Sequence, residues 1–272
     1  MSTPPAPPHT ISFGDLHLPR ILCLHGGGVN AEAFRLQSRG LLRSLNGTFR
    51  FVFPDAPYLS PADPNVMPIY AHLQPFRRWL RWKVEQPNPG ADAICQDIDN
   101  VLHDAMANDN AMGATGEWVA IMGFSQGAKL GASLLLRQQL RAEKLGRDQA
   151  GSNFKFGILL AGRAPLVSLD TDMTDSLALA DADELTTGAF AQVTGSFLQG
   201  SDHVLRLPTL HVHGKKDPGI DNHRRLLTDF CQAGTTRVVE WDGDHRVVIQ
   251  AADVAAVADE ILALSKQTGV IL

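Results

Sequence analysis

Positions 123–127 carry the sequence Gly-Phe-Ser-Gln-Gly, and this motif constrains the fold of the chain more than any other feature. The apolar run at 118–122 predicts a buried strand, and the periodic segment from 128 to about 140 predicts a helix. At a sharp strand-to-helix turn, flanking glycines let neighbouring backbone approach closely and leave the serine hydroxyl exposed. The motif therefore indicates a sheet whose strands are followed by helices.

The rest of the chain repeats this alternation of short β-rich runs and longer helical patterns. It is typical of a parallel sheet with helices on both faces. Further strands are predicted at 21–24, 49–53, 156–160, 209–212 and 236–241, and further helices at about 31–45, 91–107 and 247–265. The predicted fold class is therefore α/β, and the motif specifies an α/β-hydrolase fold with a mostly parallel central sheet.

Two segments depart from the alternation and are predicted to be lid-like insertions. Residues 58–90 carry many prolines and aromatic side chains, and we expect a long irregular excursion there. Residues 166–207 separate two predicted strands by more than an ordinary loop, so we expect this segment to hold helices of its own. Residues 1–18 are predicted to be a flexible N-terminal segment, and residues 19–272 a single domain that contains both insertions.

Composition argues against several functional classes. Hydrophobic residues make up 44% of the chain and charged residues 19%, which fits a compact enzyme. The net charge of −5 provides no basic surface for nucleic acid. No apolar stretch approaches about 18 residues and no secretion signal is found, so we expect a cytoplasmic protein outside the membrane. Scattered cysteines, and no P-loop or H-E-x-x-H pattern, argue against a metal or a nucleotide, and no cofactor is expected.

Ser125 is the candidate nucleophile. A serine hydroxyl is a weak nucleophile that needs a base held by hydrogen bonding, and in this fold the order along the chain is serine, acid, histidine. The simpler interpretation is that Ser125 only caps the helix that begins there. Capping does not explain the two glycines of the motif, so we favour the nucleophile.

His245 follows the last predicted strand and is the candidate general base. Loops at the carboxyl ends of strands form the active sites of open α/β sheets. Asp217, in the loop before that strand, is the candidate acid that orients the histidine. Asp242 and Asp244 are nearer in sequence, but such close neighbours rarely reach the ring nitrogen. The simpler alternative for His245 is a surface histidine without a role.

Other histidines are assigned structural positions. His211 and His213 alternate on one predicted strand, so both point to the same face and are expected in the core or at the sheet end. His223 lies before the last strand and is expected to be an exposed helix residue.

An oxyanion hole needs N–H donors near the nucleophile. One is expected to be the backbone N–H of Gln126, the residue after the serine. The other is expected from the sequence His-Gly-Gly-Gly at 25–28, where we favour Gly27 and keep Gly28 as an alternative. Glycine brings an amide to a carbonyl without a Cβ in the way. The triple glycine could instead be only a flexible turn.

Aromatic and cationic side chains gather at 75–82, with the sequence Pro-Phe-Arg-Arg-Trp-Leu-Arg-Trp. In one interpretation, Phe76, Trp79 and Trp82 line an acyl pocket whose rim attracts an acidic substrate or a phosphopantetheine-bearing carrier. In the other, the tryptophans belong to the core and the arginines are solvated. Both interpretations stay open at the level of sequence.

Assembled in this way, the chain resembles the fungal serine hydrolase family, often abbreviated FSH. The resemblance covers most of the chain and rests on His-Gly-Gly-Gly-Val-Asn at 25–30, Phe-Pro-Asp-Ala-Pro at 53–57, Arg-Trp at 78–79 with Trp82, Gly-Phe-Ser-Gln-Gly at 123–127, and Gly-Lys-Lys-Asp at 214–217 before His245. It implies esterase or thioesterase activity without a cofactor, often beside enzymes that build polyketides.

We therefore expect a serine hydrolase that cleaves a carboxylic ester or acyl thioester through an acyl-enzyme. The role that the resemblance implies is release of a polyketide-type acyl chain in secondary metabolism. The expected partners are a small-molecule ester or thioester and, by the same resemblance, an acyl-carrier domain of a polyketide synthase. The alternatives are a non-hydrolytic enzyme of the same fold (an acyltransferase, lyase or isomerase) or a hydrolase-derived binding protein.

Overall fold

The structure, a computed structural model, describes residues 15–63, 67–170, 172, 176–185 and 203–272. Most of the N-terminal segment predicted to be flexible lies outside the described residues. A six-stranded sheet forms the centre of the molecule. Its strands are β1 (Arg20–Leu24), β2 (Arg50–Val52), β5 (Trp118–Phe124), β6 (Phe156–Leu160), β9 (Thr209–Gly214) and β10 (Thr236–Trp241).

All neighbouring strands of this sheet are parallel, in the order β10-β9-β6-β5-β1-β2. From β1 the chain moves outward to β2, and from β5 it moves the other way to β6, β9 and β10. The order thus reverses between β1 and β5, and ligands of open α/β sheets bind beyond the carboxyl ends of the strands at such a point. The glycine loop at 25–28 and the motif at 123–127 lie at the ends of these two strands.

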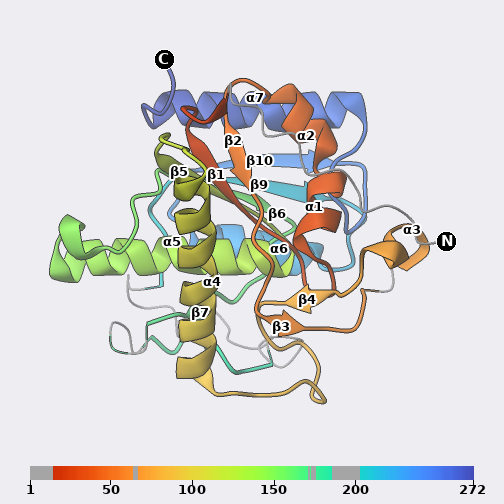
Figure 1. Cartoon of the computed structure of the whole chain (residues 1–272), viewed down its shortest axis with the longest axis vertical. Helices are drawn as coiled ribbons and strands as arrows, with labels where there is room; N and C mark the ends of the chain where they lie inside the picture. The colour runs from red at the N-terminus through yellow and green to blue at the C-terminus, as the bar shows by residue number, and fades with distance from the viewer. Residues whose placement is uncertain (1–14, 64–66, 171, 173–175, 186–202) are drawn as a thin grey trace.

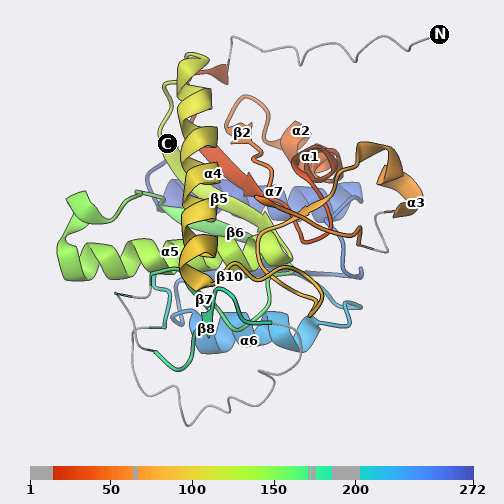
Figure 2. The same cartoon turned by 60° about the horizontal axis from the view of Figure 1, so that its bottom comes forward.

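Helices cover both faces of the sheet, as Figures 1 and 2 show. In Figure 1, α7 runs along the top of the molecule and α5 crosses below the sheet. One face carries α1 (Ala31–Gln37), α2 (Arg39–Ser44) and α7 (Ala251–Gln267), and the other carries α4 (Ala91–Ala111), α5 (Gln126–Leu145, followed by the short η3, Arg147–Gln149) and α6 (Ile220–Phe230).

Side chains of the strands alternate between two cores. In β1, Ile21 and Cys23 pack into the core beneath α7, whereas Leu22 and Leu24 pack into the core beneath α5. This alternation is the period of two that an extended strand imposes. A strand buried on both faces therefore appears as a continuous apolar run, which is why the sequence pattern could locate it.

These observations confirm the predicted α/β fold and its parallel sheet. The strands predicted at 156–160 and 236–241 are confirmed to the residue. The single helix predicted at 31–45 is wrong, because two helices meet at Ser38. Ser38 is buried with ψ at 0°, and its N–H donates to the carbonyl of Phe34 (2.9 Å) to end α1. None of the helices within the described residues is long and apolar enough to span a membrane.

The segment at 58–90 has more regular structure than the predicted irregular excursion. In it β3 (Tyr58–Leu59) pairs antiparallel with β4 (Arg77–Arg78), and α3 (Met67–Tyr70) and η2 (Ala71–Leu73) lie between them. In the second insertion, β7 (Val167–Ser168) pairs with β8 (Ala180–Asp181). The helices predicted there are not found in its described residues, and positions 186–202 lie outside them.

A buried ion-pair network closes the amino ends of the strands. Asp109, near the end of α4, is 1% exposed and accepts hydrogen bonds from Arg20 (3.2 Å) and Arg50 (2.6 Å). The guanidinium of Arg20 also lies over the ring of Trp118, 4.3 Å from its centroid. Since Arg20 and Arg50 begin β1 and β2, the network fastens α4 to the end of the sheet opposite the carboxyl ends.

Candidate active site

Ser125 lies at the turn from β5 into α5, with φ at 54° and ψ at −113°, a conformation that few non-glycine residues adopt. The two glycines of the motif are needed for this turn. A Cβ on Gly123 would come within 2.2 Å of the carbonyl oxygen of Gly127, and one on Gly127 within 2.0 Å of that of Leu24. The start of α5 thus packs directly on the end of β1 and holds the serine beyond the sheet.

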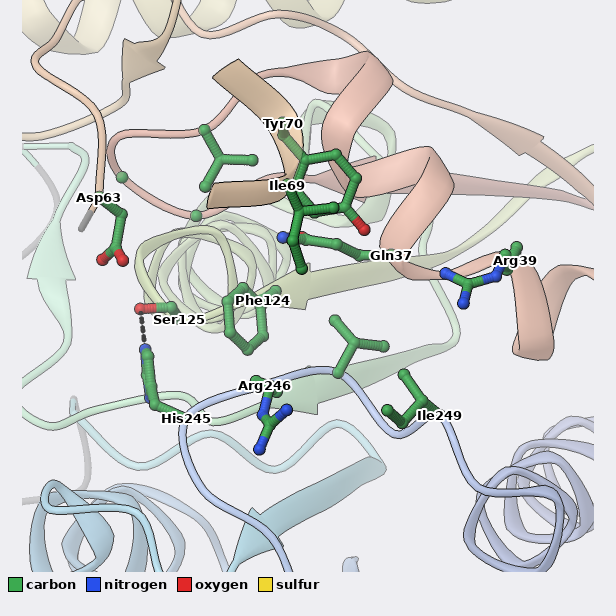
Figure 3. Close-up of a pocket in the computed structure, with 14 residues that line it drawn as sticks. Gln37, Arg39, Asp63, Ile69, Tyr70, Phe124, Ser125, His245, Arg246 and Ile249 are labelled. Carbon is green, nitrogen blue, oxygen red and sulfur yellow. Dashed lines mark hydrogen bonds between the residues drawn. The ribbon is translucent and has the colours of Figure 1, made fainter. Parts of the chain in front are cut away.

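The hydroxyl of Ser125 does not serve as a helix cap. Its side chain makes no hydrogen bond to the first turn of α5. Oγ lies instead 2.9 Å from Nε2 of His245, as the dashed line in Figure 3 marks. The interpretation in which Ser125 only caps the helix is therefore wrong.

His245 and Asp217 come from the loops that follow two neighbouring strands, β10 and β9. Nδ1 of His245 lies 2.5 Å from Oδ2 of Asp217, whose side chain is buried. The structure thus brings the three predicted side chains into one chain of hydrogen bonds, although Ser125 and His245 are 120 positions apart.

Several donors surround the Asp217 carboxylate. Oδ1 accepts the backbone N–H of Gly219 (2.7 Å), and a guanidinium nitrogen of Arg163 lies 3.5 Å away. Burial favours the neutral acid, but the hydrogen bonds from His245 and Gly219 outweigh it and lower the pKa of Asp217 from 3.8 to about 2. The ionised carboxylate accepts the Nδ1–H of His245, which leaves Nε2 to accept the serine proton.

Asp242 and Asp244 are engaged elsewhere. Asp242 is exposed and accepts a hydrogen bond from Nζ of Lys216 (2.9 Å). Asp244 accepts one from the guanidinium of Arg246 (2.9 Å), two positions along the same loop. Both carboxylates therefore pair with basic side chains, and neither contacts the ring of His245 by a hydrogen bond.

The structure distinguishes between Gly27 and Gly28 as the second N–H donor of the oxyanion hole. The N–H of Gly28 donates to the carbonyl of Arg77 (2.9 Å), so Gly28 is not available as a donor and this alternative is wrong. Gly27 lines both cavities that border Ser125, and its N–H has no partner within the described residues. The N–H of Gln126 lies at the first position of α5, where a helix supplies no acceptor.

The side chain of Gln126 fastens the excursion beside the nucleophile. Its Oε1 accepts the backbone N–H groups of Trp79 (2.7 Å) and Leu80 (3.2 Å), and its Nε2 donates to the carbonyl of Leu80 (3.0 Å). Sequence reasoning assigned a role only to the backbone of Gln126. The side-chain contacts reach segments 46 and 47 positions away, and no local pattern indicates them.

His25 holds the glycine loop in place. Its Nε2 accepts the N–H of Ala56 (3.0 Å), and its Nδ1 lies 2.8 Å from the carbonyl oxygen of Gly26. Burial lowers the pKa of His25 to about 4, so the ring is neutral near pH 7. The loop at 25–28 is therefore a fastened structure rather than a flexible turn.

Of the aromatic residues predicted to line an acyl pocket, Trp82 borders a cavity at Ser125. Trp79 and Phe76 line neither of the cavities described below. Trp79 is fully buried and its indole N–H donates to the carbonyl of His25 (2.9 Å), while Phe76 packs in a small core cluster with Val29. For Trp79 and Phe76 the pocket role is wrong, because their rings are part of the packed interior.

Two cavities border Ser125 and His245, and they differ in chemistry. The first, the apolar cavity, measures about 180 Å³ and is drawn in Figure 3. The second, the polar cavity, measures about 820 Å³. The apolar cavity includes Val29, Ile69, Tyr70, Phe124, Val247 and Ile249 in its wall, and the polar cavity includes Asp63, Lys129, Arg163, Lys216, Asp244 and Arg246. A carbonyl group placed at Ser125 would be within reach of both.

His211 and His213 are buried on one face of β9, as predicted. His223 is not the exposed residue that was expected, because its side chain is fully buried and its Nε2 lies 3.5 Å from Oδ2 of Asp217. Burial lowers the pKa of His223 to about 3, so it packs against the carboxylate as a neutral ring.

A sequence signal for the burial of His223 was present. In α6 it precedes Leu226 by three positions and Phe230 by seven, and all three residues are buried. Residues with this spacing lie on one face of a helix. The helical period therefore places His223 on the face that packs against the sheet.

Asp217, His223 and His245 present ligand atoms within 4.8 Å of one another, a spacing that would suit a metal ion. A cation bound there would have to compete with the hydrogen bond between His245 and Asp217. That hydrogen bond orients His245 toward Ser125. We therefore interpret the cluster as a hydrogen-bonding arrangement of the site.

A parallel α/β sheet that carries serine, acid and histidine in this chain order, at the carboxyl ends of its strands, defines a serine hydrolase of the α/β-hydrolase type. Residues 16–257 match the family described as serine hydrolase (FSH1), and the chain belongs to this family. The resemblance inferred from the sequence is thereby confirmed.

Similar proteins carry esterase names. The chain is 51% identical to esterase claE of Penicillium crustosum, over 96% of this chain and 98% of the relative. It is 53% identical to esterase citA of Monascus ruber, over 93% and 95% of the two chains. Together with the family match, these relatives show that the protein is an enzyme of the serine hydrolase class.

Solved structures show the same fold at low sequence identity. A carboxylesterase from Mesorhizobium loti matches with a TM-score of 0.52 and 16% identity, over 90% of this chain and 88% of the other. Acyl-protein thioesterase 2 from Zea mays matches with a TM-score of 0.51 and 17% identity, over 91% and 94%.

Proposed function

We propose that this enzyme hydrolyses carboxylic esters or acyl thioesters through an acyl-enzyme formed on Ser125. The observation that supports this most is the chain of hydrogen bonds from Ser125 through His245 to Asp217, which borders two cavities. A serine hydroxyl so placed can lose its proton to the imidazole as it attacks a carbonyl carbon.

In the proposed reaction, Oγ of Ser125 attacks the carbonyl carbon while Nε2 of His245 accepts the hydroxyl proton. The buried, ionised Asp217 stabilises the imidazolium. As the tetrahedral intermediate collapses, His245 gives its proton to the leaving alcohol or thiol, and the acyl group stays on Ser125. Water then attacks the acyl-enzyme with His245 as base, and the carboxylic acid leaves.

The negative charge that develops on the carbonyl oxygen would be stabilised by the backbone N–H groups of Gly27 and Gln126. Each is without another acceptor within the described residues, which is the state required of such a donor. A donor of this kind is typically worth about 10²–10³ in rate.

We propose that the acyl chain occupies the apolar cavity, since six aliphatic and aromatic side chains line it. The physiological role proposed is release of a polyketide-type acyl chain, with an acyl-carrier domain as the donor. Membership of the serine hydrolase family and the esterase relatives support the hydrolytic part of this role, and the acyl-carrier donor is what the family resemblance implies.

A fluorophosphonate probe and p-nitrophenyl butyrate test the assignment of the nucleophile. Ser125→Ala should lose labelling and lower the rate of hydrolysis by about 10⁴-fold or more. Ser44→Ala, which removes an exposed serine at the end of α2, should keep both. Labelling that persists in Ser125→Ala would show that another serine reacts. Labelling of the wild type without cleavage of any aryl ester or acyl thioester would favour a non-hydrolytic enzyme.

A further inference from the structure

The polar cavity has an uneven distribution of charge. Four cations line it, Lys129, Arg163, Lys216 and Arg246. Three of these have a carboxylate nearby. Lys216 pairs with Asp242 (2.9 Å), Arg246 pairs with Asp244 (2.9 Å), and Arg163 lies 3.5 Å from Asp217.

Lys129 is the exception. It is 5% exposed, and within the described residues its Nζ has no hydrogen-bond acceptor and no carboxylate partner. Nε of Arg163 is also buried without an acceptor in that part of the chain. Lys129 therefore brings to the cavity a cation that no carboxylate of the described residues neutralises, and leaving a largely buried charge unpaired is unfavourable.

The position of Lys129 relative to the nucleophile is fixed by α5. Its backbone N–H donates to the carbonyl of Ser125 (3.1 Å), so it stands one helical turn further along, about 6 Å in rise. Residues four apart lie on the same face of a helix. A group bound by Lys129 must therefore be within a few bonds of a carbonyl that is attacked by Ser125.

Burial disfavours the protonated, charged form of Lys129. Burial and, to a smaller extent, the positive charge of Arg163 together lower the pKa of the amine from 10.5 to about 7. An anion bound beside both side chains would reverse this effect and restore the ammonium.

We propose that the polar cavity binds a substrate with an anionic oxygen group, a carboxylate or the enolate of a 1,3-dicarbonyl, close to the scissile bond, and that Lys129 and Arg163 bind this group. The inference rests on the proposed hydrolysis at Ser125 and names its substrate class. The phosphate of a phosphopantetheine thioester lies many bonds from the sulfur, so it is not the group that reaches Lys129.

Asp63 also lines the polar cavity, and Figure 3 draws it beside Ser125. It comes from the excursion, whereas Lys129 comes from α5 and Arg163 from the loop after β6. The anionic group is therefore placed at the wall formed by α5 and the loop after β6, which carries Lys129 and Arg163.

Paired substrates test this proposal. In one arm, p-nitrophenyl half-esters of dicarboxylic acids of increasing length are compared with the same compounds carrying a methyl ester at the far end. In the other arm, the carboxylate or its methyl ester is on the alcohol side of an acetate ester. The two arms tell whether the anionic group belongs to the acyl or the alcohol half of the substrate.

In at least one arm the wild type should prefer the anionic member of a pair in kcat/KM by about 10- to 100-fold, the value of a hydrogen bond to a charged group. Lys129→Met should lose most of this preference, because its kcat/KM should fall far more for the anionic member of a pair than for the neutral member. Lys129→Arg should retain part of the preference. Lys216→Met, whose charge is already neutralised by Asp242, should keep it.

The outcomes are distinguishable. Hydrolysis of the neutral esters with no anionic preference in either arm would overturn this inference and leave the proposed function standing. A preference that falls equally in Lys129→Met and Lys216→Met would also overturn it, because the cause would then be the general field of the cavity. Absence of labelling and of all hydrolysis would refute the proposed function itself.

Discussion

At the scale of single residues, Asp217 is where the contacts of the site converge. His245, Gly219 and Arg163 place donors around its carboxylate, and His223 packs against it. Each donor favours the ionised form, and the ionised form fixes the orientation of His245. The carboxylate of Asp217, which orients the imidazole of His245, is thus itself held by several contacts that limit the positions it can take.

Asp217→Asn should therefore lower kcat by about 10⁴-fold, because an amide cannot accept the Nδ1–H in the same way and favours the wrong tautomer of His245. Steady-state hydrolysis of p-nitrophenyl butyrate measures the effect. Asp244→Asn is the matched control, since its carboxylate pairs with Arg246, and its kcat should stay within a few-fold of the wild type. Comparable losses in both variants would contradict the assignment of the acid.

Lys129 gives a second prediction, on stability. The folded protein releases this proton at about pH 7, whereas the ordinary pKa of the group is 10.5. Between these values the unfolded chain binds more protons, so the free energy of unfolding of the wild type should rise with pH. Lys129→Met has no amine at this position, so its free energy of unfolding should lack this dependence on pH. The variant should be more stable than the wild type by about 5 kcal/mol at pH 6, because a pKa lowered from 10.5 to about 7 costs about 1.36 kcal/mol for each tenfold change in proton affinity.

Denaturant titrations at about pH 6 and about pH 9.5 measure the difference between the two proteins, which should shrink toward the higher pH. If the difference in the free energy of unfolding between the two proteins stays constant over this range, the pKa of Lys129 is not lowered in the folded protein.

At the scale of elements, the excursion depends on one side chain of α5. Gln126→Ala would leave the N–H groups of Trp79 and Leu80 without their acceptor, at a cost of about 1–3 kcal/mol for each buried donor. Hydrogen exchange at these two amides should accelerate by about 10-fold or more. Gln149→Ala, which changes an exposed glutamine, should leave their exchange unaltered. Unchanged exchange in Gln126→Ala would show that other contacts hold the segment.

The elements of the sheet could be predicted because their signals are local. Continuous apolar runs bounded by turn residues located the strands at 156–160 and 236–241. The same reasoning placed Ser125, Asp217 and His245 in loops at one edge of the sheet, and the structure brings these three side chains together. Local pattern is sufficient when each residue is positioned by the element that it follows.

Contacts between distant segments carry no such signal. Nothing near Gly28 indicates that its N–H is occupied by the carbonyl of Arg77, and nothing near Trp79 indicates its hydrogen bond to His25. These pairs form only when the excursion folds back onto the glycine loop. The choice between Gly27 and Gly28, and between a pocket and a core tryptophan, therefore required the structure.

At the scale of the whole molecule, the carboxyl ends and the amino ends of the parallel strands have different roles. The carboxyl ends carry the side chains around Ser125, whereas the amino ends are closed by the network of Arg20, Arg50 and Asp109. Stability and activity should therefore be separable by mutation.

Asp109→Ala should lower the free energy of unfolding by about 3–5 kcal/mol, because it removes the carboxylate partner of buried Arg20 and leaves Arg50 with Asp15 alone. At temperatures where the variant is folded, its kcat/KM should remain within about 2-fold of the wild type, since surface and core sites distant from the chemistry act through stability. Asp104→Ala, an exposed position on the same helix, is the control for unfolding. A large fall in kcat/KM of folded Asp109→Ala would show that the two ends are coupled.

The turn from β5 into α5 combines several structural and functional roles within seven positions, 123–129. Glycines there are fixed by backbone contacts, and the side chains of Gln126 and Lys129 face different neighbours. An engineer who wants this scaffold to accept another compound would therefore find little freedom on the helix itself. Libraries built on the opposing walls, at residues such as Ile69, Tyr70 and Ile249, would reshape the chamber while the reacting group stays where it is.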